Sequence, residues 1–416
     1  MAQLLQIHLI QSYPPALLNR GRDNAPKSAW FGAAPRGLIS SQCLKHNMRQ
    51  LLGDMLAEAD LSIRTGYFDR VLEPALAGLG ATDAEKAIVL QAVAALGRKL
   101  PKKTDGDDSD AKPKRGRKKK EQDEKPTAVE AVEESAATAS MNNEDEDAED
   151  EVGKPEPGRV MLLLGRDEIA QLAERMLEQL RGGLARGTPS EQIAQNLLGA
   201  LGWTNPRAID LALFGRMTVG APVPSVDAAG YSAFALTVNS IEPSVDFWTA
   251  ADDLAPDGQH HADHIGEMVY HSNPVFYIYH ALDLAQLARN LGNDSGRVRL
   301  AAQAYVRATL FARPTGKAHA LAPFTLPSLA LIEAGPVALN AANAFEQPVR
   351  GSREVPLTRA AAERLMAHLG SVETMYGLER DRVLLWDTPA DATPGVAAIR
   401  AKTLDDLLAW VGRQVE

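Results

Sequence analysis

The sequence predicts a mixed protein of the α/β or α+β class, in which helical and strand patterns alternate along 416 residues. Short apolar runs typical of strands recur through the chain, and longer segments with apolar residues every three or four positions separate them. The chain is long enough for two or three domains and a sizeable core. Most of the strands are short and the helices are interspersed with them, so the pattern alone leaves the α/β and α+β classes open.

Each element is predicted from its own pattern. Two segments have apolar residues at helical spacing, 70–99 and 167–185, and we expect them to be helices of one subdomain. Thr403 is a favoured N-cap residue and predicts a closing helix at the C-terminus. The other predictions are a strand at 4–10, a helix at 41–57, strands near 208–214, 231–241 and 275–281, a helix near 296–312, a strand near 327–332, a helix at 358–369 and a strand at 381–386.

Residues 101–158 interrupt the predicted subdomain and have a composition of their own. They contain no aromatic residue, leucine or isoleucine, and carry 18 acidic against 11 basic residues, a net charge of −7. Such a segment buries too little apolar surface to offset the entropy that ordering costs. We therefore expect a disordered, charged insertion.

The charge of the whole chain is misleading about its partners. The formal charge of −10 argues against a polyanionic ligand. Outside 101–158, however, the chain holds 36 acidic and 33 basic residues, a net charge of −3, and the first fifty residues contain one acid, Asp23. The bases of these fifty residues are Arg20, Arg22, Lys27, Arg36, Lys45 and Arg49. This asymmetry points to an anion-binding surface near the N-terminus.

Cysteine usage and hydropathy bound the cellular compartment. Cys43 is the single cysteine, which excludes an internal disulfide, and the N-terminal residues lack the regions of a signal peptide. The best apolar run, at 160–164, is bounded by Arg159 and Arg166 and is far shorter than the roughly 20 residues that cross a bilayer. We expect a cytoplasmic protein that does not contact a membrane.

The most informative stretch is 18–49, LNRGRDNAPKSAWFGAAPRGLISSQCLKHNMR. Glycine, proline and asparagine punctuate its first half, which predicts a loop able to wrap a flexible strand. Its second half predicts the start of a helix, because Ser40 and Ser41 are good N-caps and apolar periodicity begins at Leu44. The bases that we expect the loop to present are Arg20, Arg22, Lys27 and Arg36.

One face of this helix suits a sugar-phosphate backbone. At about 100° per residue, Gln42, Lys45 and Arg49 share a narrow arc opposite the apolar residues. Free N–H groups and the positive end of the helix dipole lie at 40–42, about one turn before the two cations. A single pair of cations on a helix is more often a solvated face, and the acid-poor loop beside it is what favours RNA binding here.

The segment 210–220, DLALFGRMTVG, is a second candidate. A predicted strand ends at Gly215 and offers Arg216 to a phosphate and Met217 as a wedge between bases. Methionine more often fills a core, so this segment alone is a weak signal.

The segment 245–254, VDFWTAADDL, is a third candidate. Phe247 and Trp248 are adjacent, and adjacent residues of a strand point to opposite faces. At least one ring is then available to stack on or displace a base, unless both belong to an ordinary hairpin core.

Two charged clusters suggest other functions. His260, His261, Asp263 and His264 offer three imidazoles and a carboxylate to a metal, but their spacing matches no metal motif and a polar turn is the simpler interpretation. The run PKRGRKKK at 113–120 suits a nonspecific DNA contact, or a solubilising linker that its acidic neighbours mask. The sequence contains no GxSxG, Walker A or CxxC motif, which is consistent with a protein that is not an enzyme.

The stretch 18–49 resembles the N-terminal signature of the backbone subunit of the type I-E CRISPR effector complex, Cascade (the CasC/Cse-type family). The segments 210–220 and 245–254 resemble further blocks of that family, as do LAQLARNLG at 284–292 and ANAFE at 342–346, in the same order. The resemblance therefore covers most of the chain outside the insertion.

The resemblance implies an RRM-like (ferredoxin-like) core shaped like a right hand, with a helical finger subdomain and a thumb β-hairpin. The domains that it implies are a palm at 1–58 and 200–416 with the thumb at about 220–275, fingers at 59–100 and 159–199, and the disordered insertion at 101–158.

The resemblance also implies a noncatalytic role in antiviral defence. Several copies would stack along one CRISPR RNA, present it to target DNA, and contact the large, small, 5′-handle-binding and RNA-processing subunits of Cascade. We expect no cofactor and no metal; the alternative from another class is a metal-dependent nuclease built on 260–264. The guide backbone would be held by Arg20, Lys27, Ser40, Gln42, Lys45 and Arg49, and its bases interrupted by Met217 together with Phe247 or Trp248.

Overall fold

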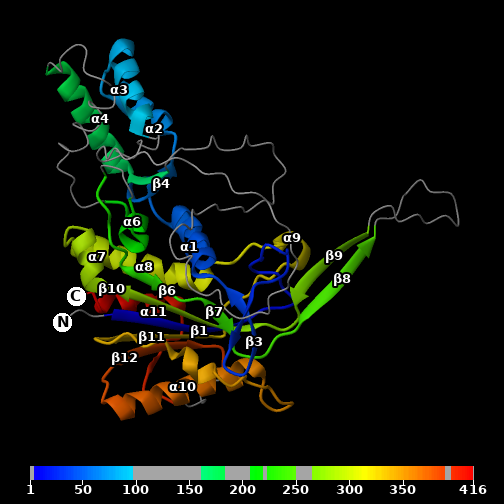
Figure 1. Cartoon of the computed structure of the whole chain (residues 1–416). Helices are drawn as coiled ribbons and strands as arrows, with labels where there is room; N and C mark the ends of the chain where they lie inside the picture. The colour runs from blue at the N-terminus through cyan, green and yellow to red at the C-terminus, as the bar shows by residue number, and fades with distance from the viewer. Residues whose placement is uncertain are drawn as a thin grey trace, which may run out of the picture.

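The computed structural model describes residues 4–96, 161–182, 207–218, 223–249, 265–388 and 395–415. Within these residues a sheet of nine strands runs through the centre, with helices on both faces (Figure 1). Its paired strands are antiparallel except β12 and β13. The order is β13 (Ile399–Arg400), β12 (Asp381–Trp386), β11 (Leu329–Gly335), β1 (Leu4–Ser12), β10 (Val275–Asp283), β7 (Ala235–Thr237), β3 (Ala34–Ile39) and β2 (Ser28–Phe31), and β6 (Gly230–Ser232) also pairs with β10.

The N-terminal strand β1 lies inside the sheet, between β10 and β11. Leu5, Ile7 and Leu9 belong to the hydrophobic core on one face, and Ile10 belongs to the core on the other. The strand is buried on both sides between two helical layers. Its polar residues Gln6 and His8 are buried too, and they form hydrogen bonds with Tyr279 and Tyr277. The predicted strand at 4–10 is confirmed.

Helices cover the two faces unequally (Figure 1). On one face lie α1 (Ser41–Met55), α6 (Ile209–Phe214), α7 (Leu284–Asn290), α8 (Ser295–Phe311) and α11 (Leu404–Arg413). On the other face lie α10 (Leu357–Tyr376) and the 3₁₀ helix η2 (Ala341–Phe345). Two further short helices are η1 (Glu58–Asp60) and α9 (Ala318–Leu321). The fold is therefore of the mixed α+β type.

A separate helical module stands above the sheet in Figure 1. It comprises α2 (Phe68–Gly78), α3 (Asp83–Leu96), α4 (Arg166–Arg181) and a small sheet of β4 (Ser62–Thr65) and β5 (Leu162–Gly165). Its core contains Phe68, Leu72 and Leu76 of α2 packed with Leu172 and Met176 of α4. Segments on either side of the predicted insertion thus pack together. The insertion itself, 101–158, lies outside the described residues.

A two-stranded hairpin of β8 (Pro243–Thr249) and β9 (Ile265–His271) projects away from the sheet (Figure 1). At its base the backbones of Ala16 and His271 exchange hydrogen bonds of 2.9 and 3.0 Å. The hairpin is therefore attached to the chain segment that follows β1.

Several predicted elements are wrong in type or extent. The predicted strand near 208–214 is the helix α6, and the predicted loop before Ser40 contains the β2–β3 hairpin. The helical segment at 70–99 is divided at Gly80, which has a φ of +68°, into α2 and α3. The predicted strand at 231–241 is two short strands, β6 and β7.

Most of the remaining predictions are confirmed, some with shifted ends. The helices predicted at 41–57, 296–312 and 358–369 correspond to α1, α8 and the longer α10. The strands predicted at 275–281, 327–332 and 381–386 correspond to β10, β11 and β12. Thr403 caps α11, and its hydroxyl accepts a hydrogen bond from the Asp406 N–H. No helix in the described ranges is both long and apolar enough to cross a membrane.

Candidate nucleic-acid interface

The N-terminus of α1 is capped as predicted. The Ser40 hydroxyl accepts a 3.4 Å hydrogen bond from the Cys43 N–H, and the Ser40 N–H donates to Asn19 Oδ1 at 3.0 Å. The first N–H groups of a helix have no intrahelical acceptor, and those of Ser41 and Gln42 precede the capped one. An anion is the ligand that such groups favour.

The predicted division of α1 into a packed and a polar face is confirmed. Leu44, Met48 and Leu52 are buried against the sheet, whereas Gln42 is exposed. Lys45 and Arg49 are partly exposed, but their partners differ.

Lys45 is a cation without an acidic partner in the described residues. Burial lowers its pKa, because the charged ammonium is partly removed from water. Burial, aided by the positive charge of nearby Lys45, also lowers the pKa of His280 in β10 to about 3, so this imidazole is neutral at pH 7. A partly buried ammonium with no carboxylate beside it gains most from an anionic ligand.

The Arg49 side chain is 30% exposed but forms an ion pair with a buried carboxylate, which corrects the prediction of two outward cations on α1. Its Nε donates to Asp210 Oδ2 at 2.9 Å and its Nη2 to the Ser62 carbonyl at 3.0 Å. Asp210 of α6 is 1% exposed and also accepts bonds of 2.8 and 2.5 Å from the Ser62 N–H and hydroxyl. A guide phosphate would have to compete with this buried carboxylate. The geometry therefore assigns Arg49 to joining α1, α6 and β4.

The basic residues that precede α1 also have unequal environments. Lys27 is partly exposed, and its ammonium makes no hydrogen bond or ion pair within the described part of the chain. Arg20 is partly exposed and pairs through its backbone with Pro26. Arg22 is exposed. Arg36 is fully buried, contrary to prediction, and its guanidinium donates at 2.8–3.2 Å to the carbonyls of Thr237, Val238, Phe345 and Glu346.

Arg216 and Met217 are neighbours in sequence with opposite environments. Arg216 is 5% exposed and forms a bidentate ion pair with Glu168 of α4, at 2.7 and 2.9 Å. This placement contradicts the prediction that Arg216 faces a phosphate, because its charge is already neutralised inside the protein. Met217 is 86% exposed, which leaves its thioether accessible, as a wedge between bases requires.

The β8–β9 hairpin presents both of its predicted aromatic residues. Phe247 is 67% and Trp248 44% exposed, so neither is an ordinary core residue. The Trp248 indole lies against the backbone of Gly266 on β9, where any side chain would overlap it. Phe247 is consequently the more accessible of the two rings.

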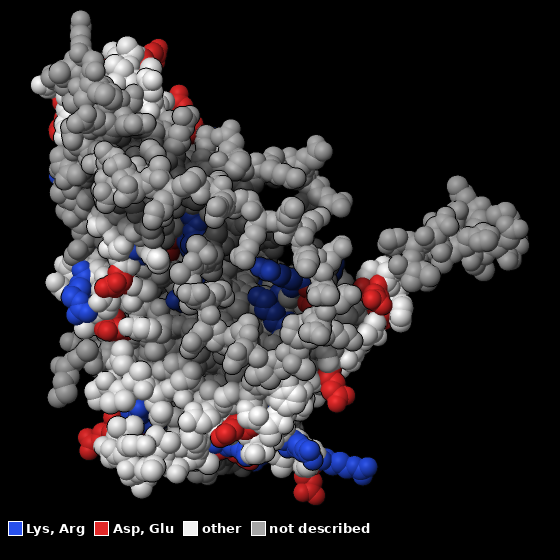
Figure 2. All heavy atoms as spheres, in the orientation of Figure 1, with Lys and Arg blue, Asp and Glu red and all other residues white. Residues whose placement is uncertain are grey.

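Basic side chains gather on the face that carries α1 and the hairpin. Figure 2 shows a group of Lys and Arg atoms between α1 and the base of the β8–β9 hairpin. Lys27 lies beside the start of α1, since the Lys27 N–H donates to the Asn19 carbonyl and Asn19 Oδ1 accepts from the Ser40 N–H. The α1 terminus, Lys27 and Lys45 thus define a basic surface, which we call the α1 surface.

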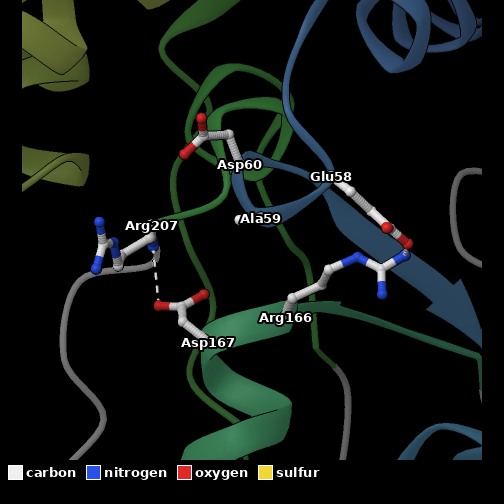
Figure 3. Close-up of a pocket in the computed structure, with 6 residues that line it drawn as sticks. All are labelled: Glu58, Ala59, Asp60, Arg166, Asp167 and Arg207. Carbon is white, nitrogen blue, oxygen red and sulfur yellow. Dashed lines mark hydrogen bonds and ion pairs between the residues drawn. The ribbon is translucent and has the colours of Figure 1, made fainter.

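A pocket of about 450 Å³ lies elsewhere, between η1 and the start of α4 (Figure 3). Each of its three carboxylates has a partner among the described residues. Glu58 pairs with Arg166, and Asp167 accepts a 3.1 Å hydrogen bond from the Arg207 N–H. Asp60 pairs with Arg297 at 2.8 Å. This balanced pocket offers no excess charge to a polyanion.

The two charged clusters lie outside the described residues. These are the histidine-rich segment at 260–264 and the basic run at 113–120. Among the residues that the structure describes, no group of three His, Cys, Asp or Glu side chains is arranged to hold a metal.

Asp210 and Glu168 are the residues of this region that the sequence analysis overlooked. Each is a buried carboxylate that forms an ion pair with an arginine that was predicted to contact RNA. A signal was available, since Asp210 stands inside an apolar run and a charge there requires a partner.

The fold is of the α+β type, and its α1 surface presents the partly exposed cations Lys27 and Lys45. The chain belongs to the CT1975-like protein family, whose profile matches residues 5–410. No curated protein sequence matches it significantly.

Solved structures share the fold over the length of the chain. One, described as "CRISPR RNA-guided surveillance complex, pre-nicking", has a chain that matches with a TM-score of 0.68 and 22% identity over 98% of this chain and 100% of its own length. Another, described as "CRISPR RNA-guided surveillance complex", matches with a TM-score of 0.60 and 21% identity over 98% and 99%.

Proposed function

We propose that this chain is the guide-RNA-binding backbone subunit of a CRISPR surveillance complex of the type I-E Cascade class. Membership of the CT1975-like family and a fold shared with chains of RNA-guided surveillance complexes support this proposal. The observation that carries it is the α1 surface, where Lys45 has no acidic partner in the described residues and a capped helix terminus stands beside it.

In this function the sheet and its helices form the RRM-like palm, the helical module forms the fingers, and the β8–β9 hairpin forms the thumb. Lys27, Lys45 and the N–H groups at the start of α1 hold guide phosphates without reading sequence. Met217 and Phe247 interrupt the bases, and the intervening nucleotides pair with target DNA. Arg20 and Gln42 supply further contacts to the backbone.

The proposed role requires positioning and no bond chemistry. A noncatalytic scaffold in the cytoplasm, with further copies of itself and the other Cascade subunits as partners, needs neither metal nor cofactor. The guide RNA is the ligand shared by all copies.

The test is RNA binding by the full chain as a function of salt. Each phosphate contact to a single strand contributes roughly 0.7 to the slope of log K against log[salt]. We expect Lys45→Gln to weaken binding of every RNA sequence alike and to reduce this slope by about 0.7, and Lys27→Gln to do the same. Lys402→Gln, which removes an exposed charge just before α11, is the matched control and leaves the slope unchanged.

Two results would refute the proposal. One is wild-type protein that neither copurifies with RNA nor binds it at low salt. The other is a salt slope that is the same in Lys45→Gln, in Lys27→Gln and in the control Lys402→Gln.

A further inference from the structure

We propose that the buried Glu168–Arg216 ion pair is a positioning device that holds Met217 rigidly exposed toward the guide bases. The inference rests on the proposed function, and it assigns roles to Glu168 and Arg216 that differ from contact with RNA. The helical module thereby supports the residue that interrupts the bases.

The Arg216 guanidinium makes four hydrogen bonds within the described residues. Besides the two bonds to Glu168, its Nη1 donates to the Leu163 carbonyl at 2.9 Å and its Nε to the Pro224 carbonyl at 3.0 Å. Glu168 Oε2 also accepts a 2.8 Å bond from the Gly165 N–H at the start of α4. The guanidinium is planar and its fork matches the carboxylate, so this set of bonds fixes its orientation as well as its charge.

Hydrogen bonds anchor the chain on both sides of Met217. Arg216 and Val226 exchange two backbone hydrogen bonds of 2.8 Å. On the other side, Thr218 Oγ1 donates to the Val223 carbonyl at 2.8 Å and lies 3.0 Å from Ser225 Oγ. Met217 is therefore held between two anchored residues.

The turn that leads into Met217 depends on a glycine. Gly215 ends α6 with a φ of +76°, and an added Cβ would lie 2.8 Å from the Val226 carbonyl oxygen and 2.9 Å from the Ala228 N. Glycine is required here because a side chain would meet backbone in a conformation that L residues rarely adopt. The chain thus leaves α6 along one fixed path.

An exposed methionine on an anchored backbone is unusual, because methionine is flexible and is usually buried. Met217 is the most exposed of the large hydrophobic residues in the described ranges, at 86%. Fixing its backbone lowers the entropy that would be lost when the thioether inserts between bases. The buried ion pair that fixes this backbone has its own desolvation penalty.

The experiment uses the full chain bound to guide RNA that carries 2-aminopurine at successive positions, since this base fluoresces more strongly when it is unstacked. We expect enhanced fluorescence at interrupted positions in the wild type, and its loss in Met217→Ala. Glu168→Gln and Arg216→Lys should lose most of it too, because neither preserves the bidentate pair, while RNA affinity changes by less than about threefold.

A double-mutant cycle separates positioning from general destabilisation. Glu168→Gln should cause no further loss of fluorescence when Met217→Ala is already present, because both remove the same contact. The matched control is Glu85→Gln, which breaks the exposed Glu85–Arg181 pair (2.8 and 3.2 Å) of the same helical module. It should leave the fluorescence at the wild-type level.

The outcomes are distinguishable. If Met217→Ala loses the fluorescence and Glu168→Gln keeps it, the positioning role is wrong, although the proposed RNA binding still holds. The same conclusion follows if Met217→Ala leaves the fluorescence unchanged. Absence of RNA from the wild type overturns the proposed function instead. If Glu168→Gln does not fold, Thr218→Val removes the anchor on the other side of Met217, and full fluorescence in that variant overturns the proposal.

Discussion

Lys45 and Arg49 lie about one turn apart on the same side of α1, and their partners give them different tasks. Arg49 is neutralised by Asp210, which is almost fully buried. Lys45 has no such carboxylate among the described residues. Charge at one position therefore stabilises the fold, and charge at the other is available to a ligand.

Stability measurements separate these two residues. Arg49→Gln leaves a buried carboxylate without its cation, so we expect it to lower the free energy of unfolding by about 2 kcal/mol. Lys45→Gln should leave the free energy of unfolding unchanged within about 0.5 kcal/mol, because it breaks no ion pair among the described residues. Urea denaturation of both variants tests this. Equal losses of stability would show that the assignment of the two residues is wrong.

Arg49 and Arg216 also show where sequence reasoning reaches its limit. The bases and the helical face are visible in the local pattern, and the polarity of α1 follows from it. The partners are not local, since Asp210 is 161 residues from Arg49 and Glu168 is 48 residues from Arg216. Only the tertiary fold determines which cation forms an internal ion pair. Lys45 and Met217 could therefore be predicted as accessible, whereas the ion pairs of the two arginines could not be predicted.

Because of Glu333 in β11, we expect the free energy of unfolding to depend on pH in the acidic range. Glu333 is fully buried, with Arg380 and Arg382 at 2.8 and 2.6 Å and His8 at 3.4 Å. Burial alone would raise its pKa, but the contacts with His8 and Arg382 lower it to about 2. A carboxylate whose pKa is depressed in the folded state stabilises it above the unfolded pKa, and this stabilisation is lost as the pH falls toward the folded pKa.

We therefore expect the wild type to lose stability between about pH 4.5 and pH 2, by roughly 3 kcal/mol from this group. Glu333→Gln should be less stable than the wild type at pH 7, and the difference should shrink toward pH 2 as the wild-type carboxylate becomes protonated. Denaturation at several pH values measures the difference. A gap that is the same at pH 7 and pH 3 would contradict this account of Glu333.

At the scale of elements, α1 contains a residue of low helix propensity, Gly53. Gly53 is exposed, and the space around it is open, so an added Cβ meets nothing within 4 Å. We expect Gly53→Ala to raise the free energy of unfolding by about 0.5–1 kcal/mol, because alanine restricts the unfolded chain and favours the helix. Thermal melting checks the sign.

Gly32 is the matched control for this substitution. It turns the β2–β3 hairpin with a φ of +59°, and a Cβ there would overlap the Glu346 carbonyl. Gly32→Ala should lower stability. If both glycine variants shifted the melting temperature in the same direction, the two environments would be wrongly described.

The elements that could be predicted are those with one buried face or with burial throughout a strand. The periodicity of α1, α8 and α10 is visible because their opposite faces meet water. The helix α6 was mistaken for a strand because five of its six residues are buried, so no polar face marks its period. The β2–β3 hairpin was not predicted because β3 contains proline and glycine, which also punctuate loops.

At the scale of the whole molecule, two ion pairs connect the helical module to α1 and α6, one of them through hydrogen bonds to Ser62. Arg49 of α1 and Asp210 of α6 bind Ser62 of β4, and Arg216 after α6 binds Glu168 of α4. In the proposed complex these pairs fix the fingers relative to the palm, so the positions of Met217 and the α1 surface are set together. The regular spacing of base interruptions along a guide would follow from this rigidity.

Ultraviolet crosslinking of the full chain to guide RNA, followed by mass spectrometry of the crosslinked peptides, tests the central claim most directly. We expect crosslinks on the peptides that contain Lys27, Lys45, Met217 and Phe247, and none on the α10 face of the sheet. Crosslinks confined to α10, or a crosslinked RNA that leaves the peptide around Lys45 unmodified, would contradict the account.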